Sequence, residues 1–189
     1  HTAATYEQIH QAVAMGVTHV THTYNAMVGL NHREPGTVGG VMTSPELCCE
    51  LIADNFHVHP AAMQILFAAK GADGVILVTD SVRVAGMPDG EYKIGGHSIL
   101  VSDGTIRLLD GTIAGSTLTL DRAVYNFMQA TGQPLESIWK TSSLNAARSI
   151  HISDHKGRLE VGKDADLVLV DEQISVHLTI AEGRIVYRQ

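Results

Sequence analysis

Residues 74–80 read Gly-Val-Ile-Leu-Val-Thr-Asp, four consecutive apolar side chains between a glycine and a Thr-Asp pair. An apolar run of this length, rich in β-branched residues and bounded by turn residues, is typical of a buried strand. Upstream, residues 60–70 are predicted to form a helix whose first turn suits Pro60. Another apolar run, residues 47–54, precedes that helix. Strand, helix and strand in this order predict a βαβ unit and therefore a parallel sheet.

The pattern continues toward the beginning of the chain. Residues 5–15 have the apolar spacing of an amphipathic helix that ends before Gly16, and residues 17–23 form a short β-branched run that favours a strand. Between this strand and the next, residues 25–40 are polar and contain Gly and Pro, and a loop is predicted there.

Beyond the 74–80 strand the pattern changes. Residues 86–115 contain seven glycines and short apolar alternations, which predict one or two β-hairpins inserted after the sheet. Helices are predicted at 118–131, 135–141 and 145–150, followed by strands at 165–171, 176–180 and 184–187. About three parallel βα units cannot close an eight-stranded barrel. The sheet is therefore small and open, or the chain is part of something larger, which the absence of a strand before the first helix favours.

Composition excludes several classes of protein. The 189 residues carry 13 Lys+Arg against 20 Asp+Glu, a formal charge of −7, without a basic cluster. Nucleic-acid binding by phosphate neutralisation is disfavoured, although one or two local cations could still hold a small anion. No run of about 18 apolar residues indicates a membrane span. Cys48 and Cys49 are adjacent and cannot be a disulfide framework, which favours a reducing, cytoplasmic location.

Histidine and aspartate residues stand where the predicted strands end. His19 and His22 follow the first strand, His57 and His59 the second, and Asp80 the third, while His1 directly precedes the first helix. The carboxyl ends of parallel strands are where α/β proteins place their sites. Imidazole and carboxylate are ligands that suit Zn²⁺. Taken singly, each histidine is more often a surface or hydrogen-bonded residue, and Asp80 serves equally well as a helix cap; only their joint placement favours a metal site.

Longer motifs in the chain resemble a known family. Thr21-His22-Thr23-Tyr24-Asn25-Ala26-Met27, His32-Arg33-Glu34-Pro35-Gly36 and residues 52–60 (Ile-Ala-Asp-Asn-Phe-His-Val-His-Pro) are similar to the N-acetylglucosamine-6-phosphate deacetylases of the amidohydrolase superfamily. The resemblance continues through residues 77–80, 85–92, 114–119 and 162–167. It implies a fold, namely the C-terminal part of a (β/α)₈ TIM-like barrel plus part of a small β-sandwich. The implied domains are residues 1–155, with the 86–115 insertion, and residues 156–189.

The resemblance also implies roles for individual residues. His1 and His22 correspond to metal ligands, Asp80 to the catalytic carboxylate, and His57, Asn25 and the Ala26 backbone to substrate-binding positions. Arg33 matches a phosphate-binding position, and the 31–36 loop, which includes His32, would reach a neighbouring subunit of a homodimer. Gly115 and Ser116 would line the sugar. The cofactor implied is a divalent metal ion, with zinc first and iron or another ion left open, and its third protein ligand is absent from this chain.

The implied reaction is hydrolysis of N-acetylglucosamine 6-phosphate to glucosamine 6-phosphate and acetate, with Asp80 acting as base and then acid. If the strands persist, His19 and His59 are expected to point to the face opposite to His22 and His57. Structural roles are therefore expected for His19 and His59. This chain alone is expected to have little or no activity. The alternatives are an amidohydrolase acting on a cyclic amide or purine, and a non-catalytic module that dimerises through its exposed sheet edges.

Overall fold

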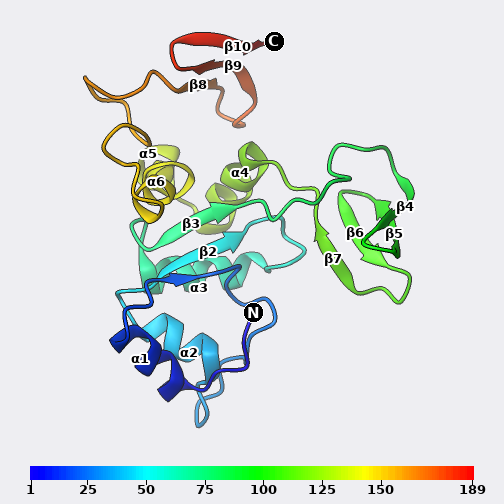
Figure 1. The fold of residues 1–189 in the computed structure, drawn as a ribbon, viewed down its shortest axis with the longest axis vertical. Helices are drawn as coiled ribbons and strands as arrows, with labels where there is room; N and C mark the ends of the chain where they lie inside the picture. The colour runs from blue at the N-terminus through cyan, green and yellow to red at the C-terminus, as the bar shows by residue number, and fades with distance from the viewer.

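The computed structural model describes residues 1–189 and contains three separate sheets (Figure 1). The central sheet is parallel, with the order β1 (His19–Val20), β2 (Cys48–Ile52), β3 (Val75–Val78). Cys49 is opposite Val75, and His19 is opposite Cys48. The predicted parallel sheet is therefore present, and its two outer strands each have one edge without a partner strand.

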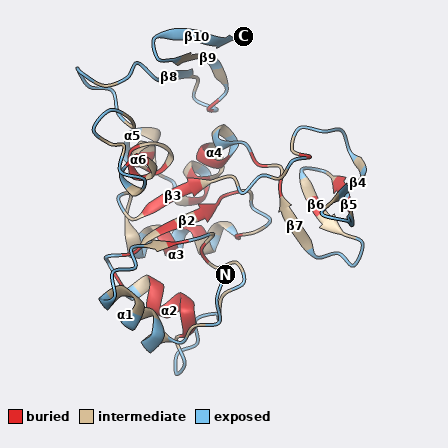
Figure 2. Ribbon diagram, in the orientation of Figure 1, coloured by how far each residue is buried: buried red, intermediate tan, exposed pale blue.

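Helices pack against this sheet and against each other. α1 (Tyr6–Ala14) contacts α2 (Gly36–Thr43), and α3 (Pro60–Lys70) contacts both α4 (Leu120–Thr131) and the strands β2 and β3. The main core is a cluster of 19 buried residues that joins the strands to α3 and α4, and Figure 2 shows these buried segments around β2 and β3. The buried Phe127 ring of this cluster meets the partly buried Phe67 ring edge-on, with 5.8 Å between centroids.

Local sequence explains where several helices begin and end. The Thr5 hydroxyl accepts a hydrogen bond from Gln8 N–H while the Gln8 side chain accepts from Thr5 N–H, a capping box that starts α1. Pro60 occupies the first turn of α3, as predicted. Gly132 ends α4 in the left-handed conformation, with φ +67°, which glycine adopts without steric cost.

The inserted segment forms its own antiparallel sheet. Its strands are β4 (Gly90–Ile94), β5 (His97–Ser102), β6 (Thr105–Leu108) and β7 (Ile113–Ser116), paired in sequence order. Val84, Ile99, Val101 and Ile106 form a second, smaller core there. Figure 1 shows this sheet beyond the carboxyl ends of β2 and β3, which places β7 next to the candidate site.

The last third of the chain begins with three short helices and ends in a third sheet. The helices are α5 (Leu135–Ile138), the 3₁₀ helix η1 (Trp139–Ser142) and α6 (Leu144–Ser149). Asn145 ties α6 to the start of β3, because its side-chain amide donates to the carbonyl oxygens of Ala72 (2.7 Å) and Val75 (2.8 Å). The third sheet has the order β10 (Arg184–Arg188), β9 (Val176–Ala181), β8 (Leu167–Val170), and β9 is antiparallel to both neighbours.

Two expectations for the first 45 residues need correction. The predicted loop at 25–40 is wrong in its last part, because α2 begins at Gly36 and runs to Thr43. Glycine is typical of loops, but a Cβ on Gly40 would lie 2.8 Å from Ile9 Cβ, so this glycine permits close packing of α1 on α2. The strand predicted at 17–23 is only His19–Val20, since the chain turns through positive φ at His22, Tyr24 and Ala26.

None of the helices combines the length and the apolar character that crossing a membrane requires.

Candidate active site

The loops that follow β1, β2 and β3 meet at one edge of the parallel sheet. His22 lies two residues beyond β1, His57 five beyond β2, and Asp80 two beyond β3. Because the three strands are parallel neighbours, all three loops leave the same edge. His22 (φ +32°), Asn55 (φ +67°) and Asp80 (φ +48°) all have positive φ without being glycine. Backbone strain of this kind gathers at functional sites, where surrounding contacts maintain it.

His1 and His22 lie together at this edge. Their ring centroids are 5.4 Å apart with the planes at 70°. The first residues are held there because Thr2 N–H donates to the Ala26 carbonyl oxygen at 2.9 Å and Thr2 bridges to Met27. Nδ1 of His22 is buried and has no hydrogen-bond partner. A buried imidazole nitrogen without a partner next to a second imidazole fits a divalent metal ion of the zinc type.

The pair is not a complete metal site. No group of three or more His, Cys, Asp or Glu side chains in the chain is arranged to hold a metal ion. Cys48 and Cys49, which are free thiols in β2, do not add to the pair; burial raises the pKa of the Cys49 thiol to about 11. The residues present therefore fit part of a metal coordination shell.

His57 is paired with a carboxylate that the sequence analysis did not select. Its Nδ1 lies 2.6 Å from Asp54 Oδ2, while Asp54 Oδ1 accepts hydrogen bonds from the N–H groups of Phe56 (2.9 Å) and His57 (2.7 Å). Burial alone would raise the pKa of Asp54, but the hydrogen bonds from His57 and Phe56 outweigh it and lower the pKa. The spacing Asp-x-x-His was a usable signal, because Asp side chains often bond to backbone N–H groups two or three residues ahead.

Asp80 is exposed, and its carboxylate makes no hydrogen bond or ion pair within the chain. Its backbone is fixed by β7, because Ser116 N–H donates to the Asp80 carbonyl oxygen at 3.3 Å and Val82 N–H to that of Ser116 at 3.1 Å. Gly115 has φ +106°, and a Cβ there would overlap the Val82 side chain. Ser116 is buried, and its hydroxyl accepts from Leu118 N–H at 2.7 Å. Gly115 and Ser116 thus support the Asp80 loop, and their contact with a sugar stays a prediction.

The loop after β1 carries the other predicted substrate-binding residues. The Asn25 side-chain amide donates to the carbonyl oxygens of His22 (3.3 Å) and Thr23 (3.4 Å), so it braces the loop. Ala26 is exposed with φ +51°, and its N–H makes no hydrogen bond within the chain. His32 and Arg33 are exposed farther along, and Arg33 lines a separate hollow of about 210 Å³ beside the start of α1. The backbone N–H of Ala26 and the guanidinium of Arg33 are therefore both available to an anion, but they lie in different parts of the loop.

His19 and His59 have the structural surroundings that were expected. A ring nitrogen of His19 lies 3.2 Å from Ser149 Oγ and 3.7 Å from Glu50 Oε1. His59 precedes α3 and its Nδ1 accepts a hydrogen bond from Ala61 N–H at 3.1 Å, which caps the helix. Neither ring forms a hydrogen bond with His22, His57 or Asp80.

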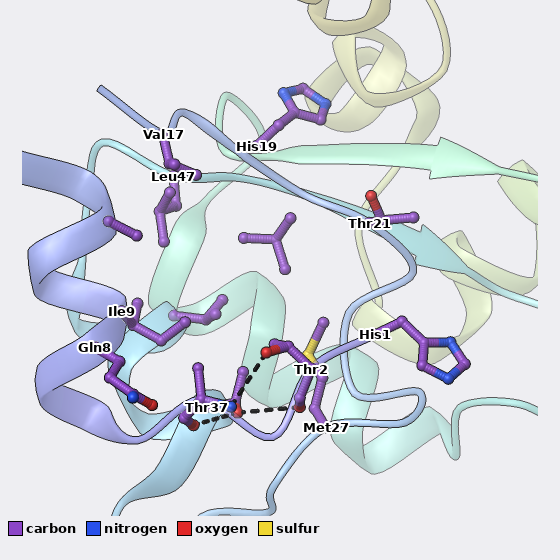
Figure 3. A pocket seen from close by; sticks show the side chains of 14 residues that line it. His1, Thr2, Gln8, Ile9, Val17, His19, Thr21, Met27, Thr37 and Leu47 are labelled. Atoms are coloured by element: carbon purple, nitrogen blue, oxygen red, sulfur yellow. Dashed lines mark hydrogen bonds between the residues drawn. The ribbon is translucent and has the colours of Figure 1, made fainter. Parts of the chain in front are cut away.

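A cavity of about 300 Å³ lies beside the His1 segment and is lined by residues of α1, α2 and β1 (Figure 3). Its lining is mainly apolar, including Ile9, Val20, Val41 and Leu47. The Thr37 hydroxyl donates to the Ala4 carbonyl oxygen at 2.6 Å, so this polar group in the wall already has a partner. Figure 3 shows the His1 and His19 rings directed away from the centre of the cavity. The cavity therefore lies beside the candidate site, and of the residues proposed for that site it shares only His1.

Comparisons with known proteins cover almost the whole chain. The model of the amidohydrolase family matches residues 1–186. N-acetylglucosamine-6-phosphate deacetylases of Lysinibacillus sphaericus and Bacillus subtilis are 46% and 42% identical over 98% and 99% of this chain. The alignments span 48% and 47% of those relatives, so the chain has about half their length. A putative N-acetylgalactosamine-6-phosphate deacetylase of Escherichia coli K12, 41% identical, is instead covered over 98% of its length.

Solved structures agree with the sequence comparisons. The crystal structure of N-acetylglucosamine-6-phosphate deacetylase from Thermotoga maritima superposes with a TM-score of 0.93 at 39% identity. The match covers 99% of this chain and 51% of that one. A D267A mutant of the Mycobacterium smegmatis deacetylase, in complex with N-acetyl-D-glucosamine 6-phosphate, has a TM-score of 0.91 at 32% identity over 98% of this chain and 49% of its own. The family match and these relatives together show that the chain belongs to the amidohydrolase family.

Proposed function

We propose that this chain supplies the catalytic carboxylate and two metal ligands of an enzyme that hydrolyses N-acetylglucosamine 6-phosphate to glucosamine 6-phosphate and acetate. The observation that carries the proposal is the single sheet edge at which the His1–His22 pair, His57 and Asp80 follow adjacent parallel strands. The names of its relatives support the choice of substrate. A cytoplasmic location goes with this proposal.

The proposed architecture is the C-terminal part of a (β/α)₈ barrel. Residues 1–155 would be its last strands and helices, with the β4–β7 sheet as an insertion, and residues 156–189 part of a small β-sandwich. Two features support this division. The strands β1 and β3 each have an edge without a partner strand, and the C-terminal sheet exposes apolar side chains such as Val168, Ile185 and Val186. Unpaired edges and exposed apolar faces are features that proteins normally cover.

His1 and His22 would hold a divalent ion, for which zinc is the first choice because two imidazoles suit it. When bound, such an ion lowers the pKa of a coordinated water to about 7 and polarises the amide carbonyl. The Asp80 carboxylate, free of partners, accepts the proton of the attacking water and returns it to the leaving amine nitrogen. His57 presents its Nε2 to an oxygen of the substrate.

The phosphate is assigned to the loop after β1. The unpaired N–H of Ala26 can donate to a phosphate oxygen. Arg33 offers a planar, always charged fork that matches phosphate. Because Arg33 is on an exposed loop away from the sheet edge, we assign it and His32 to the site of a neighbouring subunit in a homodimer.

Acetate release tests the proposal. The 189-residue protein is assayed with zinc and N-acetylglucosamine 6-phosphate, next to a chimera that joins the upstream half of the Lysinibacillus sphaericus relative to this chain. We expect turnover by the chimera, loss of it in Asp80→Asn, and little or none in the 189-residue protein, because its metal site lacks a third ligand. N-acetylgalactosamine 6-phosphate is the matched control for the sugar, since two Escherichia coli relatives, one of them as putative, are named as deacetylases of that compound.

Other results would overturn the proposal. Hydrolysis of unphosphorylated cyclic amides by the chimera, without action on the amino-sugar phosphate, would favour a different amidohydrolase. A stable dimer of the 189-residue protein that binds no zinc, together with an inactive, folded chimera, would favour a non-catalytic module. Turnover by the 189-residue protein at the rate of the chimera would refute its dependence on further residues.

A further inference from the structure

The carboxylate of Asp54 is directed entirely at the turn that carries His57. Oδ1 accepts from two backbone N–H groups, those of Phe56 and His57, and Oδ2 lies 2.6 Å from the His57 ring nitrogen Nδ1. The two side chains are only 9% and 10% exposed. A carboxylate so placed is stable only because its oxygens are engaged by hydrogen-bond donors.

The contact determines where the ring proton lies. The pKa of Asp54 is lowered, so its carboxylate is ionised near neutral pH and can only accept hydrogen bonds. Nδ1 of His57 must then carry a proton, whether the ring is neutral or charged. His57 Nε2 makes no hydrogen bond within the chain and is not among the buried atoms without a partner, so it reaches solvent at the sheet edge.

Bracing of the turn does not account for the whole contact. Oδ1 alone bonds the two backbone N–H groups and thereby supports the positive φ of Asn55. The turn is also held from α4, because the Asn126 side-chain amide donates to the Ala53 carbonyl oxygen at 2.8 Å. Oδ2 contacts the imidazole ring and no backbone group. One oxygen is therefore structural, and the other acts on the ring.

We propose that Asp54 is a positioning residue, which holds His57 as the Nδ1–H tautomer and presents Nε2 to the substrate at the edge of the sheet. The role rests on the proposed function only in that Nε2 faces substrate; the tautomer itself does not depend on that function. In a neutral ring, Nε2 then accepts a hydrogen bond, and in a protonated ring it donates one to an anionic oxygen.

The imidazole ¹⁵N spectrum of the 189-residue protein, recorded above the titration range of histidine, tests the tautomer. His57 is identified by the signal that disappears in His57→Gln. We expect Nδ1 to be protonated and Nε2 not. In Asp54→Asn the ratio of the Nδ1–H tautomer to the Nε2–H tautomer of His57 should fall about tenfold. A neutral amide can either accept a hydrogen bond from Nδ1 or donate one to it, and the charge-assisted hydrogen bond to the carboxylate is lost.

The chain provides a matched control. His155 Nδ1 lies 2.7 Å from Asp154 Oδ1, nearly the same distance, but these side chains are 46% and 80% exposed. Asp154→Asn should leave the His57 signals unchanged. Should Asp54→Asn fail to fold, the wild-type spectrum still decides, because an Nε2–H tautomer at His57 overturns the proposal. An unchanged His57 tautomer in a folded Asp54→Asn variant would do so as well.

Titration with N-acetylglucosamine 6-phosphate separates the two proposals. A ligand that shifts the Nε2 resonance and leaves Nδ1 protonated supports both. The Nδ1–H tautomer in a protein whose His57 does not respond to the ligand, with the chimera inactive, counts against the proposed function and leaves the Asp54–His57 geometry standing. Turnover by the chimera with an Nε2–H His57 would refute the positioning role alone.

Discussion

Replacement of Asn145 by Ala should destabilise the chain more than the same replacement of Asn126. Asn145 is 3% exposed and its side-chain amide donates to two carbonyl oxygens, those of Ala72 and Val75, at the start of β3. Asn126 is half-buried and donates to one, that of Ala53. Both asparagines connect a helix to the parallel sheet. Comparing the two variants therefore measures how much such side-chain hydrogen bonds stabilise the chain.

The magnitude follows from the groups left unpaired. A buried carbonyl that loses its donor costs about 1–3 kcal/mol, so the loss of two costs about 2–6 kcal/mol. The Asn145→Ala change also removes the side-chain Oδ1, which is buried without a partner in the native chain. Its removal returns about 1–3 kcal/mol. The net destabilisation expected for Asn145→Ala is about 2 kcal/mol, the difference between the middles of the two ranges, against about 1 kcal/mol for Asn126→Ala, whose carbonyl is more easily reached by water.

Urea denaturation followed by circular dichroism measures the unfolding midpoint and the free energy of unfolding of both variants. The expected result is a lower midpoint for Asn145→Ala than for Asn126→Ala, with unchanged slopes. A midpoint for Asn145→Ala at or above that of Asn126→Ala would contradict the larger stabilisation assigned to Asn145. It would mean that β3 begins correctly without its tie to α6.

Three further predictions concern the core, a helix cap and acid stability. Phe127→Ala, in the main core, should lower the free energy of unfolding measured with urea by about 3–5 kcal/mol. Phe56→Ala, at a side chain that is 50% exposed, should lower it by less than about 0.5 kcal/mol. Equal losses of stability would contradict the assigned core. Thr5→Ala should lower the free energy of unfolding by about 1 kcal/mol because it removes the capping box of α1. Thr119→Ala, at an N-cap without a side-chain hydrogen bond, should change it little. A larger effect at Thr119 than at Thr5 in the same assay would be evidence against the capping role of Thr5. The pKa of Asp54 is lower in the folded chain than in the unfolded chain. The stabilisation by its carboxylate is therefore present above the unfolded pKa of about 3.9 and is lost as the pH falls through the folded value. The difference in free energy of unfolding between wild type and Asp54→Asn should accordingly narrow from pH 6 to pH 3, and a constant difference would exclude this linkage.

Much of the fold could be predicted from short-range patterns. The helix at 60–70 has the predicted bounds, and the strand at 74–80 forms as β3 (Val75–Val78). These elements are determined by Pro60 and the apolar runs, which act within a few residues of where they stand. The same patterns placed His22, His57 and Asp80 after parallel strands, and therefore at one edge of the sheet.

Tertiary structure decided what depends on contacts between distant residues. Gly36, Gly39 and Gly40 look like loop residues locally, but they lie in a buried helix because α1 packs closely enough to exclude a Cβ at Gly40. The meeting of His1 with His22 depends on Thr2 binding to the loop at Ala26. Asp54 could be linked to His57 by its spacing, but only the folded turn places its Oδ2 2.6 Å from the ring nitrogen Nδ1 and buries both side chains. Most of the elements and the family can thus be inferred from the sequence, because their signals are local or shared with relatives, whereas helix α2, the short first strand and the geometry around each histidine depend on the packed chain.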